Sequence, residues 1–151
     1  MIELKRILLV EDNQNDVELT IEALREYNLA NEVQVVRDGQ EALDFLHRHG
    51  AYEQYAPGNP AVILLDLKLP KISGHEVLEQ IKSDDKLKCI PVVVLTSSRE
   101  EYDRAKCYEN YANAYVVKPI DFHEFINAVK ELGVFWLLVN EPPPGSIRKE
   151  I

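Results

Sequence analysis

The chain has 151 residues, a length typical of one domain that can bury a hydrophobic core. Its 17 basic and 26 acidic residues give a net charge of −9, which argues against a nucleic-acid surface because phosphate contacts require clustered lysine and arginine. No apolar run approaches the roughly 20 residues of a membrane span, and the first predicted strand leaves no room for a signal peptide, so we expect a cytoplasmic protein.

Strand-like and helix-like segments alternate along the chain. The first, third and fourth strand-like runs are continuously apolar, which is typical of strands covered on both faces of a parallel sheet. The helix-like segments place apolar residues three and four positions apart. In chain order, the predicted strands are residues 6–10, 32–36, 62–66, 91–96 and 114–117, and the predicted helices are residues 16–27, 40–47, 74–83, 100–111 and 122–139.

This alternation predicts an α/β protein with a flavodoxin-like, doubly wound, five-stranded parallel sheet in the order 2-1-3-4-5 and five helices. Asn15 is expected to cap the first helix, and Ser73 the third, where Glu76 completes a capping box. Residues 1–140 form the predicted domain, with a long surface loop at 50–60. The proline-rich tail 141–151 is expected to leave the last helix, fray, and form no further domain.

Acidic residues follow two of the predicted strands. Glu11 and Asp12 directly follow residues 7–10, and Asp66 follows the apolar run 61–65. Because the carboxyl ends of parallel strands meet at one edge, three negative charges should lie together there. Like charges disfavour each other's ionisation unless a cation lies among them. The pattern predicts a site for Mg²⁺ (or Mn²⁺), with Asp66 as a nucleophile that accepts a phosphoryl group; the alternative is that these carboxylates cap helices or face solvent.

Two further polar residues follow strands at the same predicted edge. Thr96 ends the fourth strand and offers a hydroxyl, and Lys118, before Pro119, follows the fifth and offers an ammonium for phosphoryl oxygens. Each has an ordinary structural explanation, since threonine often caps a helix and Lys-Pro often forms a turn. Their common position with the acids is what favours a phosphoryl-transfer site.

Neither the cysteines nor the histidines form a recognisable site. Cys89 and Cys107 are too far apart for a CxxC pair, and two cysteines alone do not indicate zinc. No histidine falls at metal-ligand spacing, so we expect no special role for His75 or the other three.

Taken together, the motifs resemble the receiver domain of two-component response regulators, from about residue 5 to residue 131. The matched segments are 7–12, 38–43, 65–70 with Gly74, 91–97 and 115–119. The resemblance implies a set of roles: Asp66 is the phosphoacceptor; Glu11, Asp12, Asp66 and the backbone carbonyl of Lys68 bind the metal; Thr96 is the switch hydroxyl; Tyr115 is the switch aromatic; and Lys118, ahead of a cis Pro119, contacts the phosphoryl group.

The resemblance also implies a signalling mechanism. A sensor histidine kinase phosphorylates Asp66, Thr96 moves toward the phosphoryl group, and Tyr115 swings inward, which reshapes the surface of the fourth helix, fifth strand and fifth helix. Too few residues follow the fifth helix for an output domain, so we expect a stand-alone response regulator that signals through an unidentified protein. An intermediate phosphocarrier in a phosphorelay is the alternative.

The C-terminal segment 134–139 is apolar all round, whereas a surface helix needs one apolar stripe. This favours a symmetric homodimer through the last helix and its neighbours, the alternative being core packing of an extended helix. The apolar ending, the 50–60 loop and the absence of an output domain resemble response regulators paired with cyanobacterial and bacterial phytochromes, which implies a phytochrome as the kinase.

Two other classes of protein, an enzyme and a scaffold, are alternatives to a phosphorylation switch. An aspartyl-phosphate phosphatase or phosphotransferase similar to the haloacid dehalogenases needs a second aspartate two residues after the first, where this chain has Lys68. A scaffold with a degenerate site would lack some of the motif residues, and all are present. We therefore expect a phosphoacceptor switch and not an enzyme acting on other substrates.

Overall fold

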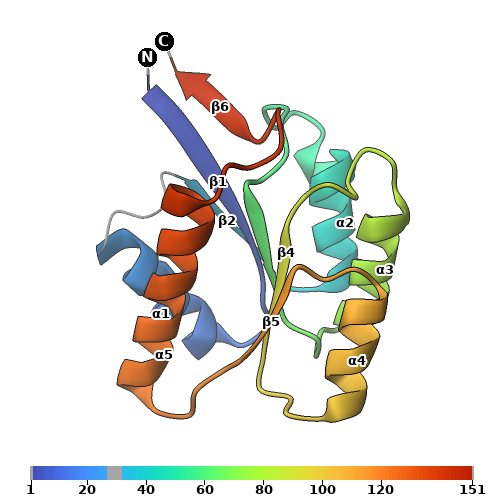
Figure 1. Cartoon of the computed structure of the whole chain (residues 1–151). Helices are drawn as coiled ribbons and strands as arrows, with labels where there is room; N and C mark the ends of the chain where they lie inside the picture. The colour runs from blue at the N-terminus through green and yellow to red at the C-terminus, as the bar shows by residue number, and fades with distance from the viewer. Residues whose placement is uncertain (1, 27–31, 151) are drawn as a thin grey trace.

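Helices cover both faces of a central sheet in the computed structural model, which describes residues 2–26 and 32–150. Helices α1 and α5 lie on one face of the sheet, and α2, α3 and α4 lie on the other (Figure 1). The strands are β1 (Ile2–Val10), β2 (Glu32–Val36), β3 (Val62–Leu65), β4 (Val92–Thr96), β5 (Ala114–Val117) and β6 (Ile147–Glu150), and the helices are α1 (Gln14–Glu26), α2 (Gly39–His47), α3 (Gly74–Ser83), α4 (Glu101–Glu109) and α5 (Phe122–Gly133).

The five predicted strands form a parallel sheet in the order β2-β1-β3-β4-β5, which confirms the flavodoxin-like architecture. Every residue of β3 and β4 is buried, as their continuous apolar sequences predict. One apolar cluster, which includes Phe45 and Leu78, fills the side of α2 and α3. A second, which includes Leu24 and Leu137, fills the side of α1 and α5. The sheet is thus held between two cores.

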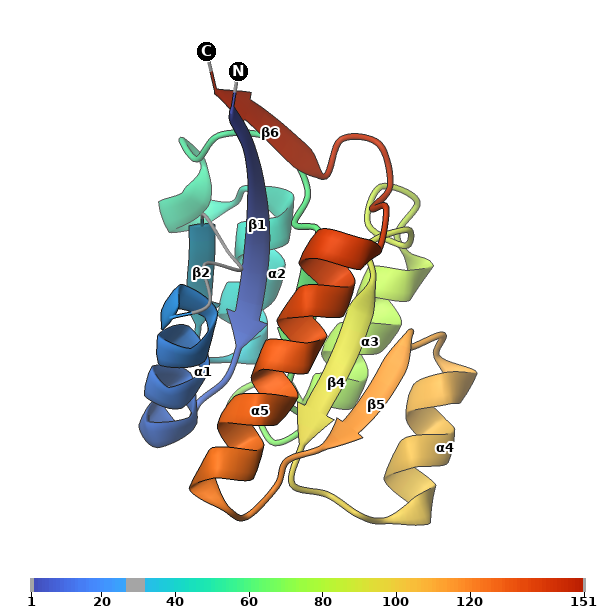
Figure 2. The same cartoon turned by 60° about the vertical axis from the view of Figure 1, so that its left-hand side comes forward.

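A sixth strand was not predicted. The first residues of β1 extend beyond the sheet and pair antiparallel with β6, with Ile2 opposite Glu150 and Lys5 opposite Ile147 (Figures 1 and 2). The expectation that the end of the tail frays is therefore wrong over Ile147–Glu150. The backbone groups of this segment find their partners in the N-terminal extension of β1, which the predicted strand at 6–10 omitted.

The 50–60 loop is held in place by hydrogen bonds, and one of them joins it to the C-terminal tail. Arg48 donates from its guanidinium to the carbonyls of Ala56 and Gly58, and Arg6 also donates to the carbonyl of Gly58, at 3.1 Å. The amide of Asn59 donates to the carbonyl of Gly145 at 3.2 Å. A short 3₁₀ turn, Gly50–Tyr52, begins this loop. The predicted surface loop is thus ordered, and it holds the tail that leads into β6.

Two predicted helix starts have different outcomes. Ser73 caps α3 as expected, since its hydroxyl accepts the amide of Glu76 at 3.3 Å. The cap of α1 is Asn13 and not Asn15, because the Asn13 side chain accepts the amide of Asp16 at 3.0 Å and the helix begins at Gln14. The predicted end of this helix, residue 27, lies outside the described residues.

The last predicted helix changes its form part-way. It is α-helical to Gly133 and continues as a π-helix over Val134–Val139. Leu137 in the π-helix is fully buried, whereas Phe135, Leu138 and Val139 are 48%, 63% and 63% exposed. The apolar segment therefore packs on the core by one side only. No helix in the described part of the chain has the length and apolar character needed to cross a membrane.

Candidate phosphoryl-transfer site

The ends of β1 and β3 bring two acids together. Val10 pairs with Leu65 in the sheet, so Glu11 and Asp66 follow neighbouring positions. The amide of Asp66 continues the ladder by donating to the carbonyl of Val10 at 3.1 Å. This edge, where β1, β4 and β5 also end, lies at the bottom of Figure 2. The predicted juxtaposition of these two acids is present.

The ends of β4 and β5 bring a lysine to the same edge. Thr96 pairs with Val117, and the amide of Lys118 donates to the carbonyl of Thr96 at 2.7 Å. From there the Lys118 side chain enters the site, where it is 8% exposed. The fixed register of β4 and β5 therefore determines where this ammonium lies.

Lys118 binds three carboxylates at once. Its Nζ donates to Oδ2 of Asp16 at 2.8 Å, to Oε2 of Glu11 at 2.9 Å and to Oδ2 of Asp66 at 3.2 Å. An ammonium has three protons to donate, so its hydrogen-bonding capacity is filled. One positive charge thus offsets part of the negative charge of three acids in a largely buried site.

Burial and like charge perturb this group of residues. The pKa of Glu11 is raised from 4.5 to about 7, first by burial and then by the negative charge of Asp66, while Lys118 acts in the opposite direction. Burial alone would lower the pKa of Lys118, but the hydrogen bond to Asp16 and the charges of Asp66 and Glu11 outweigh it and raise that pKa above its ordinary value. The ammonium therefore stays charged, and the charged form of Glu11 is disfavoured by its burial and by the neighbouring Asp66.

The remaining predicted metal ligands are at the surface. Asp12 and Lys68 are both exposed. Among the described residues, no three acidic, histidine or cysteine side chains are arranged to hold a metal ion. The donors are nevertheless carboxylate and carbonyl oxygens, which Mg²⁺ and Mn²⁺ prefer, and the pKa of Glu11 is raised first by burial and then by the negative charge of Asp66, both of which a nearby cation would counter. By this chemistry, the residues fit a divalent cation.

The backbone around Asp66 is fixed by α3. Oδ1 of Asp66 accepts the amide of Leu67 at 2.7 Å, and the amide of Gly74 donates to the carbonyl of Leu67 at 2.9 Å. A Cβ on Gly74 would lie 2.3 Å from the carbonyl oxygen of Asp66 and 2.5 Å from Cα of Leu67. Only glycine therefore allows the start of α3 to pack this closely behind Asp66.

The two predicted switch residues converge on Ser98 in the loop after β4. The fully buried hydroxyl of Thr96 accepts the Ser98 amide at 3.3 Å, and the hydroxyl of Tyr115 donates to the Ser98 carbonyl at 3.0 Å. Tyr115 is half-buried, and burial raises the pKa of its phenol. The Tyr115 side chain is thus tied to the loop that follows Thr96.

One prediction at the site is wrong and two residues were missed. The Lys118–Pro119 peptide bond is trans, and the lysine reaches the acids from this backbone, so no cis bond is needed to aim it inward. Asp16 was not predicted, although the first turn of the helix after β1 must start at this edge. Ser98 has no signal in the sequence, because its contacts depend on how the loop after β4 is folded.

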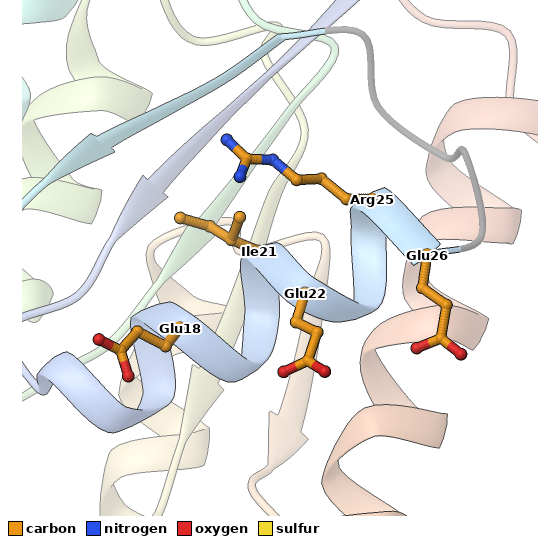
Figure 3. Close-up of a pocket in the computed structure, with 5 residues that line it drawn as sticks. All are labelled: Glu18, Ile21, Glu22, Arg25 and Glu26. Atoms are coloured by element: carbon orange, nitrogen blue, oxygen red, sulfur yellow. The ribbon is translucent and has the colours of Figure 1, made fainter.

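A separate hollow of about 800 Å³ lies along α1, and none of the site residues lines it. Figure 3 shows its five lining residues, with the carboxylates of Glu22 and Glu26 projecting to one side of the helix, Ile21 and Arg25 to the other, and Glu18 toward the start of the helix. The acids and Lys118 described above therefore form a distinct site at the sheet edge.

Residues 7–130 match a family model described as the response regulator receiver domain. The chain belongs to this family. It is 44% identical over 133 residues to the response regulator Rcp1 of Synechocystis sp., a match that covers 88% of this chain and 89% of Rcp1. A crystal structure of the Mn²⁺-bound form of Rcp1 gives a TM-score of 0.87 at 42% identity and covers 92% of this chain and 99% of that one.

Two other structures of response regulators are also similar. That of the phosphorylated cyanobacterial phytochrome response regulator RcpA gives a TM-score of 0.88 at 44% identity and covers 93% of this chain and 99% of that one. That of the bacteriophytochrome response regulator RtBRR gives 0.74 at 59% identity, with 95% and 86% covered. The receiver fold predicted from the motifs is thus shown by sequence and by structure.

Proposed function

We propose that this receiver is a phosphorylation switch in which Asp66 accepts a phosphoryl group from a sensor histidine kinase. The observation that carries the proposal is the ammonium of Lys118 bound to Asp66, together with Glu11 and Asp16, at the carboxyl edge of the sheet. The Asp66 side chain is 11% exposed, so it is shielded but accessible at this edge. The signal then passes to other proteins by contact.

The proposed step is an attack of an Asp66 carboxylate oxygen on phosphorus. A P–O bond forms, the P–N bond to the kinase phosphohistidine breaks, and its electron pair stays on the imidazole nitrogen. Lys118 lies 3.2 Å from Oδ2 of the Asp66 carboxylate and would exchange one of its three carboxylate contacts for a phosphoryl oxygen, while the amide of Leu67 holds Oδ1 of Asp66. Glu11, Asp12, Asp66 and the Lys68 carbonyl would hold Mg²⁺ or Mn²⁺, which would neutralise charge on the transferring group. The Mn²⁺-bound form of Rcp1 supports this assignment.

Intact-mass measurement after incubation with acetyl phosphate and Mg²⁺ tests the step. We expect a phosphate adduct on the wild type and none on Asp66→Asn. Asp38→Asn is the matched control: Asp38 also follows a strand of this sheet, but its carboxylate caps α2 by accepting the amide of Glu41 at 2.8 Å. An adduct that survives in Asp66→Asn would contradict the assignment. Turnover of a small phosphoester would instead favour an enzyme, although Lys68 stands where such enzymes need an acid.

We further propose that the kinase is a phytochrome. The similarity to the phytochrome response regulators RcpA and RtBRR supports this pairing. Phosphotransfer from each purified histidine kinase of the source organism should be fastest from a phytochrome kinase. Faster transfer from another kinase would reject the pairing, and rapid onward transfer to a histidine phosphotransfer protein would favour a phosphorelay carrier.

A second copy of the chain is the proposed occupant of the surface formed by α5, the π-helix and β5. A groove of about 500 Å³ lies here, next to the edge strand β5. Its apolar lining includes Val116, Leu132, Phe135 and Trp136. Exposed apolar surface of this kind is costly in a monomer, and a symmetric dimer would cover it on both copies.

Sedimentation velocity at micromolar concentration tests the dimer. We expect Phe135→Glu to shift the wild-type dimer to monomer, because this 48% exposed side chain lines the groove of the proposed interface. Tyr55→Ser removes a 43% exposed aromatic from the loop after α2, where its ring contacts Phe45 of α2 and does not line the groove, and should leave the dimer intact. A wild type that sediments only as monomer would reject the proposal.

A further inference from the structure

A chain of polar contacts outside the carboxylate site links α3, α4 and the loop after β4. Oγ of Ser98 donates to Oδ2 of Asp103 at 2.6 Å, and Oδ1 of Asp103 lies 2.9 Å from Nε2 of His75. On its other side, Nδ1 of His75 lies 3.8 Å from the sulfur of Cys107. The side chains of His75 and Asp103 are 18% and 23% exposed, so water screens these contacts only in part. His75 of α3 thus contacts two residues of α4, Asp103 and Cys107, which its sequence position did not indicate.

These polar contacts tie the first turn of α4 to α3 and to the loop after β4. Cys107 is the one buried residue that α4 contributes in the described structure, so the helix has little apolar packing of its own. Asp103 binds Ser98 and His75 through different oxygens, and these hydrogen bonds lower its pKa. An ionised acceptor makes stronger hydrogen bonds than a neutral one. The position of α4 against α3 and the loop therefore depends on Asp103.

Ser98 connects these contacts to the switch residues. Its side chain binds Asp103, its amide donates to the Thr96 hydroxyl, and its carbonyl accepts from Tyr115. With one lone pair occupied by the Ser98 amide, the Thr96 hydroxyl keeps its own proton free to donate. Fixing Ser98 therefore fixes the orientation of Thr96 and the anchor of Tyr115 at the same time.

We propose that Asp103 and His75 are positioning residues of the phosphorylation switch, which hold Ser98 so that Thr96 is oriented to donate to the phosphoryl group on Asp66. The inference rests on the proposed function, because it assigns control of that same site to residues of α3 and α4. Neither residue touches the reacting atoms; they act through Ser98. Any partner that displaces α4 would thereby change how readily Asp66 is phosphorylated.

Phosphorylation by acetyl phosphate with Mg²⁺ tests the inference in the full chain. Asp103→Ala and Ser98→Ala should each slow phosphorylation by about tenfold, the scale of one lost hydrogen bond to a charged group. Ser98→Thr, which keeps the hydroxyl, should restore the rate. The double variant Ser98→Ala/Asp103→Ala should be no slower than either single variant, because both remove the same contact. Additive losses would overturn the inference.

Glu101→Ala is the matched control, since Glu101 is an exposed acid in the same first turn of α4. It should leave the rate unchanged. Amide hydrogen exchange at Ser98 gives a second readout that needs no phosphorylation: exchange should accelerate in Asp103→Ala and not in Glu101→Ala. If the wild type is phosphorylated but Asp103→Ala and Glu101→Ala show the same phosphorylation rate and the same exchange at Ser98, the inference is overturned and the proposed function stands. A wild type that takes up no phosphate would overturn the proposed function and the inference with it.

Discussion

Lys118 determines how three acids can share one site. Its ammonium is 8% exposed and contacts Glu11, Asp16 and Asp66 within 3.2 Å. Burial and then the negative charge of Asp66 raise the pKa of Glu11 to about 7 despite its direct hydrogen bond to the ammonium. The site is therefore strained electrostatically before any phosphoryl group arrives.

Lys118→Ala should destabilise the metal-free protein at pH 8. Removing one partner of a buried ion pair typically costs about 3 kcal/mol, because the acids lose their counter-charge. The loss should be smaller at pH 5.5, where Glu11 takes up a proton. Urea unfolding in EDTA measures both values. Lys71→Ala, which breaks a 3.4 Å pair of a 67% exposed lysine with Asp38, should cost below about 1 kcal/mol; equal losses would contradict this account.

Glu11 should make the stability of the metal-free protein fall as pH rises. Its pKa in the folded state, about 7, lies above the ordinary 4.5, so the folded state binds the proton more tightly. This stabilisation is complete below pH 4.5 and lost as pH rises through 7. It amounts to roughly 3 kcal/mol at about 1.4 kcal/mol per pH unit. Subtracting the urea-unfolding profile of Glu11→Gln from that of the wild type isolates this contribution, and a flat difference between pH 4.5 and 7 would refute it.

At the scale of single elements, the start of α3 supports the backbone of Asp66, the proposed phosphoacceptor. Gly74→Ala would force its new Cβ to within 2.3 Å of the Asp66 carbonyl oxygen, so the backbone of one or the other must move. We expect a loss of about 2 kcal/mol in the free energy of unfolding, the scale of an overpacked core, and slower phosphorylation of Asp66. Glu79→Ala, on the exposed face of the same helix, should change neither. Wild-type behaviour of Gly74→Ala would show that the close packing is dispensable.

The elements also show what the sequence can and cannot reveal. The apolar strands β3 and β4 and the capping of α3 by Ser73 follow from local patterns, so they were predicted correctly. Acids and a lysine at strand ends could be placed together because parallel strands share one edge. The contacts of Ser98 could not, since they join an irregular loop to α4, β4 and β5. The pairing of β6 with β1 joins the two ends of the chain, and no local pattern records such a partner.

At the scale of the whole molecule, the N-terminal extension, the 50–60 loop and the tail form one assembly at the end of the sheet opposite Asp66 and Lys118. Lys5 donates to the carbonyl of Leu137 at the end of the π-helix, Arg6 binds the loop at Gly58, and Asn59 of the loop binds the tail at Gly145. These contacts are separated from Asp66 by the length of the central strands. Truncation of the tail should therefore lower the free energy of unfolding and leave the phosphorylation rate of Asp66 unchanged.

Two truncations separate the contributions of this assembly. Removing residues 147–151 deletes β6 and its pairing with Ile2–Lys5, whereas removing residues 141–151 also deletes the Gly145 carbonyl that Asn59 binds. At about 1 kcal/mol per net hydrogen bond, we expect the shorter truncation to lower the free energy of unfolding by about 2 kcal/mol and the longer one by about 1 kcal/mol more. Urea unfolding measures both losses, and amide exchange at Asn59 should accelerate strongly only in the longer truncation.

Asp66 should still take up phosphate from acetyl phosphate at the wild-type rate in both truncations, because β1, β3 and β5 keep Glu11, Asp66 and Lys118 in register. A large loss of phosphorylation in a folded truncation would instead mean that the chain ends act on the switch through the sheet.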